Sequence, residues 1–126
     1  MQNRPTILVI DDSNQFLFMM KSMLEFNRLN VNAMADSLES KAIIESKTYD
    51  LIIIDYIMDK MDGLQLAEFI RQTEKNKRTK VILLTTKGLD EFELETVNRL
   101  QLKYIQKPIV PADLVKKILV MVGERL

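Results

Sequence analysis

The stretch Leu51-Ile52-Ile53-Ile54-Asp55 decides the fold class of this chain. An unbroken apolar run of this length is too short for a helix, and its lack of alternation indicates a strand buried on both faces. A second run, Ile7-Leu8-Val9-Ile10, ends in Asp11-Asp12. Because parallel strands end at the same edge of a sheet, these two runs predict a sheet with carboxylates gathered at one edge.

Segments of strand and helix character alternate along the rest of the chain. Acid residues at the spacing of an N-cap and its third helical position mark three helix starts: Asp36 with Glu39, Asp62 with Gln65, and Asp90 with Glu93. We expect strands at 6–10, 31–35, 51–54, 80–84 and 103–106, and helices at 13–28, 38–46, from 62, at 91–99 and from 111. This alternation predicts an α/β fold with a doubly wound, five-stranded parallel sheet in the order 2-1-3-4-5.

Length and composition narrow the class of protein. The 126 residues suit a single domain over 1–126, with a core from about 6 to 122. Lys+Arg and Asp+Glu are both 18, so charge balance predicts no general attraction to nucleic acid or membrane. The absence of cysteine and histidine excludes disulfides, thiolate chemistry and the usual general base. No apolar run approaches the roughly 20 residues that cross a bilayer, and we expect a cytoplasmic protein.

The acid cluster predicts chemistry with a hard cation. Crowded carboxylates without histidine or cysteine favour Mg²⁺, with Mn²⁺ as a substitute. Asp12 and Asp55 are expected to be direct ligands, and Asp11 binds directly or through water. Lys107 would add a second positive charge and Thr85 a hydroxyl donor at the same edge. Asp55 is the best candidate nucleophile, because its strand is expected to be central and an aspartate can form an acyl phosphate.

These residues resemble a known family. Asp11-Asp12, Asp55, Thr85 and Lys107-Pro108, in that order, are similar to the conserved set of the response regulator receiver domain, which has a CheY-like, flavodoxin-like (βα)5 fold. Residues 55–64 also resemble the family's signature around its phosphorylated aspartate. The resemblance covers the chain from Thr6 to about Val122.

The resemblance implies a function for each matching position. Asp55 would accept a phosphoryl group from a histidine kinase or a histidine phosphotransfer protein. Asp11, Asp12, Asp55 and the backbone carbonyl of Ile57 would hold Mg²⁺. Lys107 and Thr85 would bind the phosphoryl oxygens, and Tyr104 would be an aromatic switch residue. The Lys107-Pro108 bond would be cis.

The resemblance also implies how the signal leaves the domain. Phosphorylation would change a surface formed by the fourth helix, the last strand and the last helix. Since no DNA-binding module follows Leu126 in this sequence, we expect output through a downstream protein target, unless the sequence is a fragment of a longer regulator, and phosphorylation-dependent homodimerisation is another option. No enzyme activity is expected beyond the domain's own phosphorylation and dephosphorylation. The apolar run around Leu17 and Phe18 is expected either to be covered or to form an exposed docking patch for the phosphodonor.

Several positions depart from the family's pattern. Ile57 stands where many relatives have a polar residue, Asp59 replaces a usual proline, and Thr86 is larger than the residue often found there. Because bulk beside the phosphoryl site would hinder water, we expect a long-lived phosphorylated state. The stretch Arg99-Leu100-Gln101-Leu102 lacks the small Gly-Ala step that usually precedes the last strand.

Three alternative functions remain open from sequence. A receiver-like module could signal by protein contact without phosphorylation. A Mg²⁺-dependent phosphatase could use an aspartyl phosphate, although Ile57 stands where such enzymes usually need a second acid. A nucleotide-binding protein of the same fold is less favoured, because the turn Asp11-Asp12-Ser13 is acidic and lacks glycine.

Overall fold

The computed structural model describes residues 4–123, so the expected domain limits at residues 1 and 126 lie outside the described part. Its parallel strands form one five-stranded sheet in the order β2-β1-β3-β4-β5, which confirms the expected fold class. The strands are β1 (Thr6–Ile10), β2 (Asn30–Met34), β3 (Leu51–Asp55), β4 (Lys80–Thr85) and β5 (Lys103–Gln106). The helices are α1 (Asn14–Phe26), α2 (Ser40–Ser46), α3 (Gly63–Gln72), α4 (Glu91–Arg99) and α5 (Pro111–Met121).

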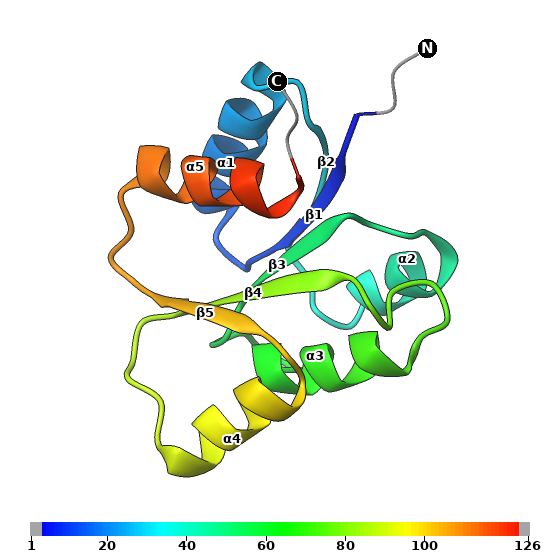
Figure 1. Ribbon diagram of the computed structural model, residues 1–126, viewed down its shortest axis with the longest axis vertical. Helices are drawn as coiled ribbons and strands as arrows, with labels where there is room; N and C mark the ends of the chain where they lie inside the picture. The colour runs from blue at the N-terminus through cyan, green and yellow to red at the C-terminus, as the bar shows by residue number, and fades with distance from the viewer. Residues whose placement is uncertain (1–3, 124–126) are drawn as a thin grey trace.

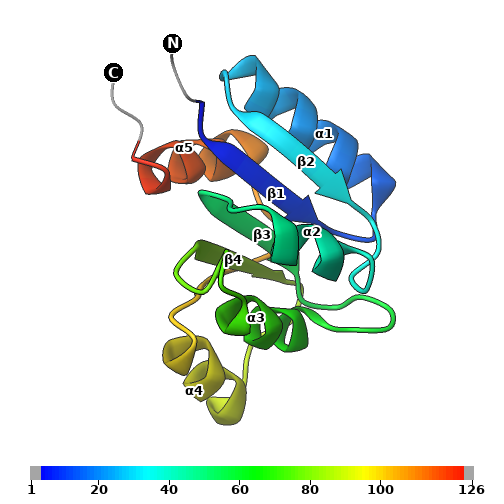
Figure 2. The same cartoon turned by 90° about the vertical axis from the view of Figure 1, so that its right-hand side faces the viewer.

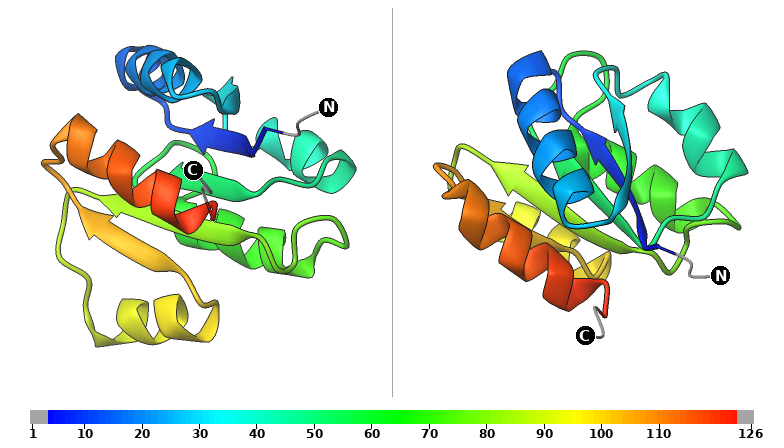
Figure 3. Two further views of the ribbon diagram at one scale, coloured as in Figure 1. Left: turned by 45° about the horizontal axis from the view of Figure 1, so that its top comes forward. Right: turned by 90° about the horizontal axis from the view of Figure 1, so that it is seen from above.

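Helices cover both faces of the sheet, as Figure 1 and the left view of Figure 3 show. Leu51 and Ile53 of β3 pack with α1 and α5, whereas Ile52 and Ile54 pack with α2, α3 and α4. All residues of β3 are buried, and Figure 2 shows this strand between β1 and β4. A buried isoleucine contributes about 1.5–3 kcal/mol, so this run alone strongly favours a sheet that is covered by helices on both faces.

The helix starts agree with the capping pattern in two places out of three. Asp62 and Asp90 are N-caps, and each forms a capping box with the residue three positions later. The second helix is present and ends at Ser46 as expected, but its expected start at Leu38 is wrong, because α2 begins only at Ser40. Asp36 Oδ1 instead accepts N–H bonds from Leu38 and Glu39, at 2.8 and 3.1 Å, in a turn before the helix. The same acid pattern therefore capped a turn rather than the first residue of an α-helix.

Helix α1 gives a mixed result for the expected docking patch. Leu17 is only 7% exposed, because it packs against the sheet together with Met20 and Leu24, one helical turn and two turns further on. Phe18, about 100° further round the helix, is 75% exposed. Of the two alternatives left open for this run, Leu17 is therefore covered, and Phe18 alone of that pair is exposed.

Strand register brings the predicted site residues to one edge of the sheet. Ile10 of β1 lies beside Ile54 of β3, Asp55 lies beside Leu84 of β4, and Thr85 lies beside Gln106 of β5. The residues that follow these positions leave the sheet together. Among residues 4–123, no helix is both long enough and apolar enough to cross a bilayer.

Candidate functional site

Three aspartates form the centre of the candidate site. Asp11 and Asp12 follow β1, and Asp55 is the last residue of β3. One carboxylate oxygen from each lies within 4.8 Å of those of the other two. Asp11 and Asp55 are buried, and Asp12 is exposed to solvent. The sheet edge thus places three acids around one space that opens to solvent on the side of Asp12.

Lys107 supplies the positive charge that the sequence predicted. Its Nζ lies 3.2 Å from Asp55 Oδ1 and 3.5 Å from Asp11 Oδ2. The Phe16 ring of α1 lies beneath the same ammonium, with its centroid 5.1 Å away. The Lys107-Pro108 bond is cis, as expected. One lysine therefore faces two of the three acids.

The charge of the cluster is only partly compensated. Burial raises the pKa of Asp11, although a hydrogen bond from the Ser13 N–H at 2.9 Å and the Lys107 charge oppose this. Burial also raises the pKa of Asp55, and the Asp11 charge adds to the effect while Lys107 reduces it. Among residues 4–123, Asp11 Oδ2 is a buried side-chain oxygen without a hydrogen-bond partner. A buried oxygen without a hydrogen-bond partner, in a cluster of three acids that shares one lysine, favours a bound cation.

Thr85 and Tyr104 occupy different environments. Thr85 ends β4 and is fully buried, and its hydroxyl exchanges two hydrogen bonds with the backbone of Lys87. Tyr104 lies on the edge strand β5 and is 39% exposed. Thr85 is therefore at the site's edge but held by its own loop, and Tyr104 lies beside β4, opposite Leu83.

The loop after Asp55 carries the expected carbonyl of Ile57, whose side chain is 54% exposed. Ser37, from the loop after β2, braces this segment. Its hydroxyl donates to the Asp59 carbonyl at 3.1 Å and accepts the Met61 N–H at 3.2 Å. Ser37 thus ties the loop that lacks the usual proline to a different part of the chain.

Gly63 allows helix α3 to begin close to the end of β3. A Cβ at this position would lie 2.6 Å from the Asp55 carbonyl oxygen and 2.9 Å from Tyr56 Cα. Since real side chains do not tolerate such distances, this position requires glycine. Our sequence reasoning assigned no role to Ser37 or Gly63, and an Asp-Gly pair just after the acidic loop was the only local signal for the glycine.

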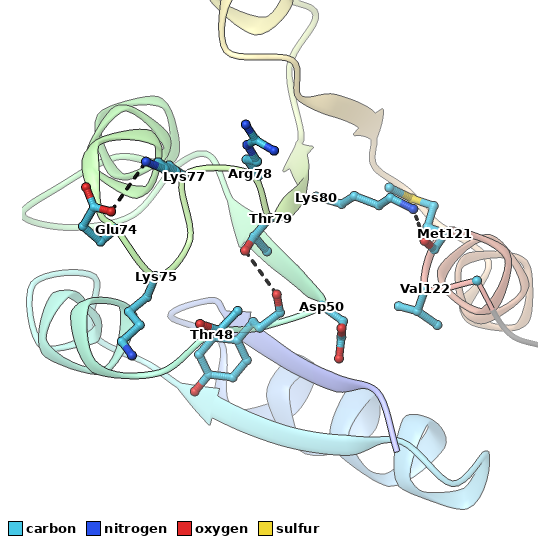
Figure 4. Close-up of a pocket in the computed structure, with 12 residues that line it drawn as sticks. Thr48, Asp50, Glu74, Lys75, Lys77, Arg78, Thr79, Lys80, Met121 and Val122 are labelled. Carbon is cyan, nitrogen blue, oxygen red and sulfur yellow. Dashed lines mark hydrogen bonds and ion pairs between the residues drawn. The ribbon is translucent and has the colours of Figure 1, made fainter. Parts of the chain in front are cut away.

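An open hollow of about 570 Å³ lies at the opposite end of the sheet. Figure 4 shows that residues before β3 and β4 line it together with the end of α5. Its basic residues are accompanied by Asp50 and Glu74, and Glu74 pairs with Lys77 at 3.5 Å. The hollow therefore has mixed charge and lies where the strands begin, far from the acid cluster at their ends.

Comparison with known proteins decides the family. The family model described as the response regulator receiver domain matches residues 7–119. This chain is a response regulator receiver domain. Receiver domains are phosphoacceptor switches of two-component signalling systems, so the family is one of signalling proteins rather than a classical family of enzymes. They typically bind Mg²⁺ at an acidic site and interact with histidine kinases, phosphotransfer proteins and effector domains.

Individual relatives support the same assignment. The transcriptional regulatory protein SrrA of Staphylococcus aureus is 28% identical over 112 residues, which are 89% of this chain and 45% of that protein. The receiver domain therefore spans less than half the length of that curated relative. Among solved structures, the Francisella response regulator 1452 receiver domain is 27% identical with a TM-score of 0.83, covering 95% of this chain and 98% of its own. A CheY-like receiver domain protein from Methanospirillum hungatei JF-1 is 28% identical with a TM-score of 0.86, and the match covers 97% of this chain and 96% of that one.

Proposed function

We propose that Asp55 is the carboxylate that accepts the phosphoryl group, and that residues 1–126 form one receiver domain. The supporting observation is its position at the end of the buried central strand, 3.2 Å from Lys107 Nζ and within 4.8 Å of two further acids. An Asp55 oxygen would attack the phosphorus of a phosphohistidine. The new O–P bond forms as the P–N bond breaks, which leaves an acyl phosphate on Asp55 and a free histidine on the donor.

The donor set fits Mg²⁺, with Mn²⁺ as a substitute. Asp11, Asp12 and Asp55 offer hard carboxylate oxygens, and Asp11 Oδ2 is a buried oxygen without a hydrogen-bond partner among residues 4–123. The Ile57 backbone carbonyl would complete the protein ligands. The cation, when bound, neutralises charge that develops on the phosphoryl oxygens.

Lys107 and Thr85 would bind the phosphoryl oxygens. Lys107 already faces Asp55, so it would need little movement. Thr85 would have to release the hydrogen bond that its hydroxyl donates to the Lys87 carbonyl before it could donate to a phosphoryl group. Tyr104 would follow Thr85 as a switch residue. These shifts would change the surface formed by α4, β5 and α5.

The phosphodonor is proposed to be a histidine kinase or a histidine phosphotransfer protein. Exposed Phe18 offers an apolar contact for this partner on α1, the helix that begins just after Asp11 and Asp12. A downstream protein would read the α4-β5-α5 surface, and phosphorylation-dependent homodimerisation is a second output of the same surface. We place this activity in the cytoplasm, and we assign no nucleic-acid or membrane contact to the residues of this chain.

Phosphorylation by a small donor tests the proposed chemistry. The protein is incubated with acetyl phosphate and MgCl₂, and its intact mass is measured with and without EDTA. The wild type and the control variant Asp59→Asn should each gain the mass of one phosphoryl group, whereas Asp55→Asn and the EDTA-treated sample should not. A wild type that also fails to react with beryllofluoride would favour a module that signals without phosphorylation.

A further inference from the structure

A single carboxylate joins the residue after the proposed phosphoacceptor to helix α4. The Tyr56 hydroxyl donates to Glu93 Oε2 at 2.5 Å, and both side chains are buried. The other oxygen of Glu93 accepts the Asp90 N–H at 2.9 Å and so closes the capping box at the start of α4. In Figure 1, α4 lies on the same face of the sheet as α3. The Tyr56–Glu93 bond thus fixes the first turn of α4 against the end of β3.

The same carboxylate also holds the loop between β4 and α4. Lys87 Nζ lies 2.9 Å from Glu93 Oε2 and 5.6 Å from the centroid of the Tyr56 ring. These contacts lower the pKa of Glu93 to about 2, chiefly through the hydrogen bond from Tyr56. Glu93 is therefore an ionised acceptor shared by two side chains from different segments.

Lys87 in turn holds the hydroxyl of Thr85. The Lys87 N–H donates to Thr85 Oγ1 at 3.1 Å, and Thr85 Oγ1 donates its proton to the Lys87 carbonyl at 3.0 Å. Because the hydroxyl has only one proton, Thr85 cannot keep this bond and donate to a phosphoryl oxygen at the same time. The chain of contacts from Tyr56 through Glu93 and Lys87 to Thr85 is called the resting latch below.

We propose that Tyr56 and Glu93 are positioning residues that hold Lys87, and through it the Thr85 hydroxyl, in the resting arrangement. The proposal rests on the proposed function, in which Thr85 turns to a phosphoryl group on Asp55. Contacts that exist only in the resting state stabilise that state by their own free energy, and this lowers the population of the active state. Weakening the resting latch should therefore make the domain easier to phosphorylate.

Two substitutions weaken the resting latch and leave nearby structure in place. Tyr56→Phe removes the hydroxyl and keeps the ring in the core. Glu93→Gln removes the charge that holds Lys87, yet a glutamine still supplies the acceptor that a capping box requires. A matched control is Tyr49→Phe, since Tyr49 is also buried and its hydroxyl donates to Asn32 Oδ1 at 2.7 Å, at the other end of β3.

The experiment compares phosphorylation rates at subsaturating acetyl phosphate with Mg²⁺, and the amide NMR shifts of residues 85–90 before phosphorylation. For Tyr56→Phe and Glu93→Gln we expect rates about three to ten times higher than wild type, where tenfold corresponds to about 1.4 kcal/mol. The amide shifts should move part of the way towards those of the beryllofluoride-bound wild type. Tyr49→Phe should change neither quantity, which separates the resting latch from a general loss of stability.

Each outcome has a distinct meaning. Equal or lower rates in both variants, or the same changes in Tyr49→Phe, would overturn the resting latch. A wild type that does not react would overturn the proposed function instead. If Tyr56→Phe does not fold, Lys87→Met decides, because the Lys87 side chain is 49% exposed and its loss should leave the fold intact. An unchanged rate in Lys87→Met would then refute the proposal.

Discussion

Removing the Ser37 hydroxyl should weaken both the fold and the proposed cation site. Ser37→Ala deletes a donor to the Asp59 carbonyl and an acceptor for the Met61 N–H, at 3.1 and 3.2 Å. At about 1 kcal/mol for each hydrogen bond, we expect a loss of about 2 kcal/mol in the free energy of unfolding. For a domain of 126 residues this corresponds to a melting temperature lower by about 7 °C.

The same substitution should reduce Mg²⁺ affinity, because the braced loop carries the Ile57 carbonyl. Removing a group that orients a metal ligand typically lowers the affinity for the metal by about tenfold or more. Urea denaturation gives the stability, and isothermal titration with MgCl₂ gives the affinity. Ser46→Ala is the control, since the exposed Ser46 hydroxyl makes one hydrogen bond at 3.3 Å. We expect this control to change the free energy of unfolding by no more than about 0.5 kcal/mol. A Ser37→Ala protein with unchanged Mg²⁺ affinity would refute the positioning role, and one as stable as the Ser46→Ala control would refute the brace itself.

Three further predictions follow from the described contacts. Gln101 has φ 57°, so Gln101→Gly should raise the free energy of unfolding by about 0.5–1 kcal/mol, and an unchanged or lower melting temperature would contradict this. Asp11→Asn should stabilise the protein in EDTA, and more so at pH 7 than at pH 4. Burial raises the pKa of Asp11, so the contribution of Asp11 to the free energy of unfolding falls as the pH rises above 3.8, the pKa of an aspartate in the unfolded chain. If thermal melts show the same increase in stability at both pH values, the buried charge of Asp11 is not its cause. The phosphorylated Ile57→Asn and Thr86→Ala variants should hydrolyse faster than the wild type, since both side chains are exposed beside the site and hinder water there. Hydrolysis rates that are unchanged or slower in both variants would show that these side chains do not protect the phosphoryl group.

The sequence predicted the sheet and the acid cluster because both follow from local pattern. Apolar runs that end in charged residues specify buried parallel strands, and parallel strands place Asp11, Asp55 and Lys107 at one edge whatever the details of packing. The Asp62 and Asp90 helix starts were also readable, because a capping box needs only residues three positions apart.

The features that sequence reasoning missed join distant segments. Ser37 meets Asp59 across 22 positions, and Tyr56 meets Glu93 across 37, so no short spacing announces either pair. The covered side of α1 also stayed open, because a helix that is apolar nearly all round does not show which side meets the sheet. Such contacts depend on how neighbouring loops pack, which the order of elements does not specify.

We propose that Asp55, and no other acid of this chain, receives the phosphoryl group. Borohydride reduces an aspartyl phosphate to homoserine, so reduction after treatment with acetyl phosphate and MgCl₂ marks the modified position for peptide sequencing by mass spectrometry. We predict homoserine at position 55 in the wild type, and unmodified aspartate at positions 11, 12 and 59. Homoserine at another aspartate, or none in a protein that has gained a phosphoryl group, would contradict the proposal.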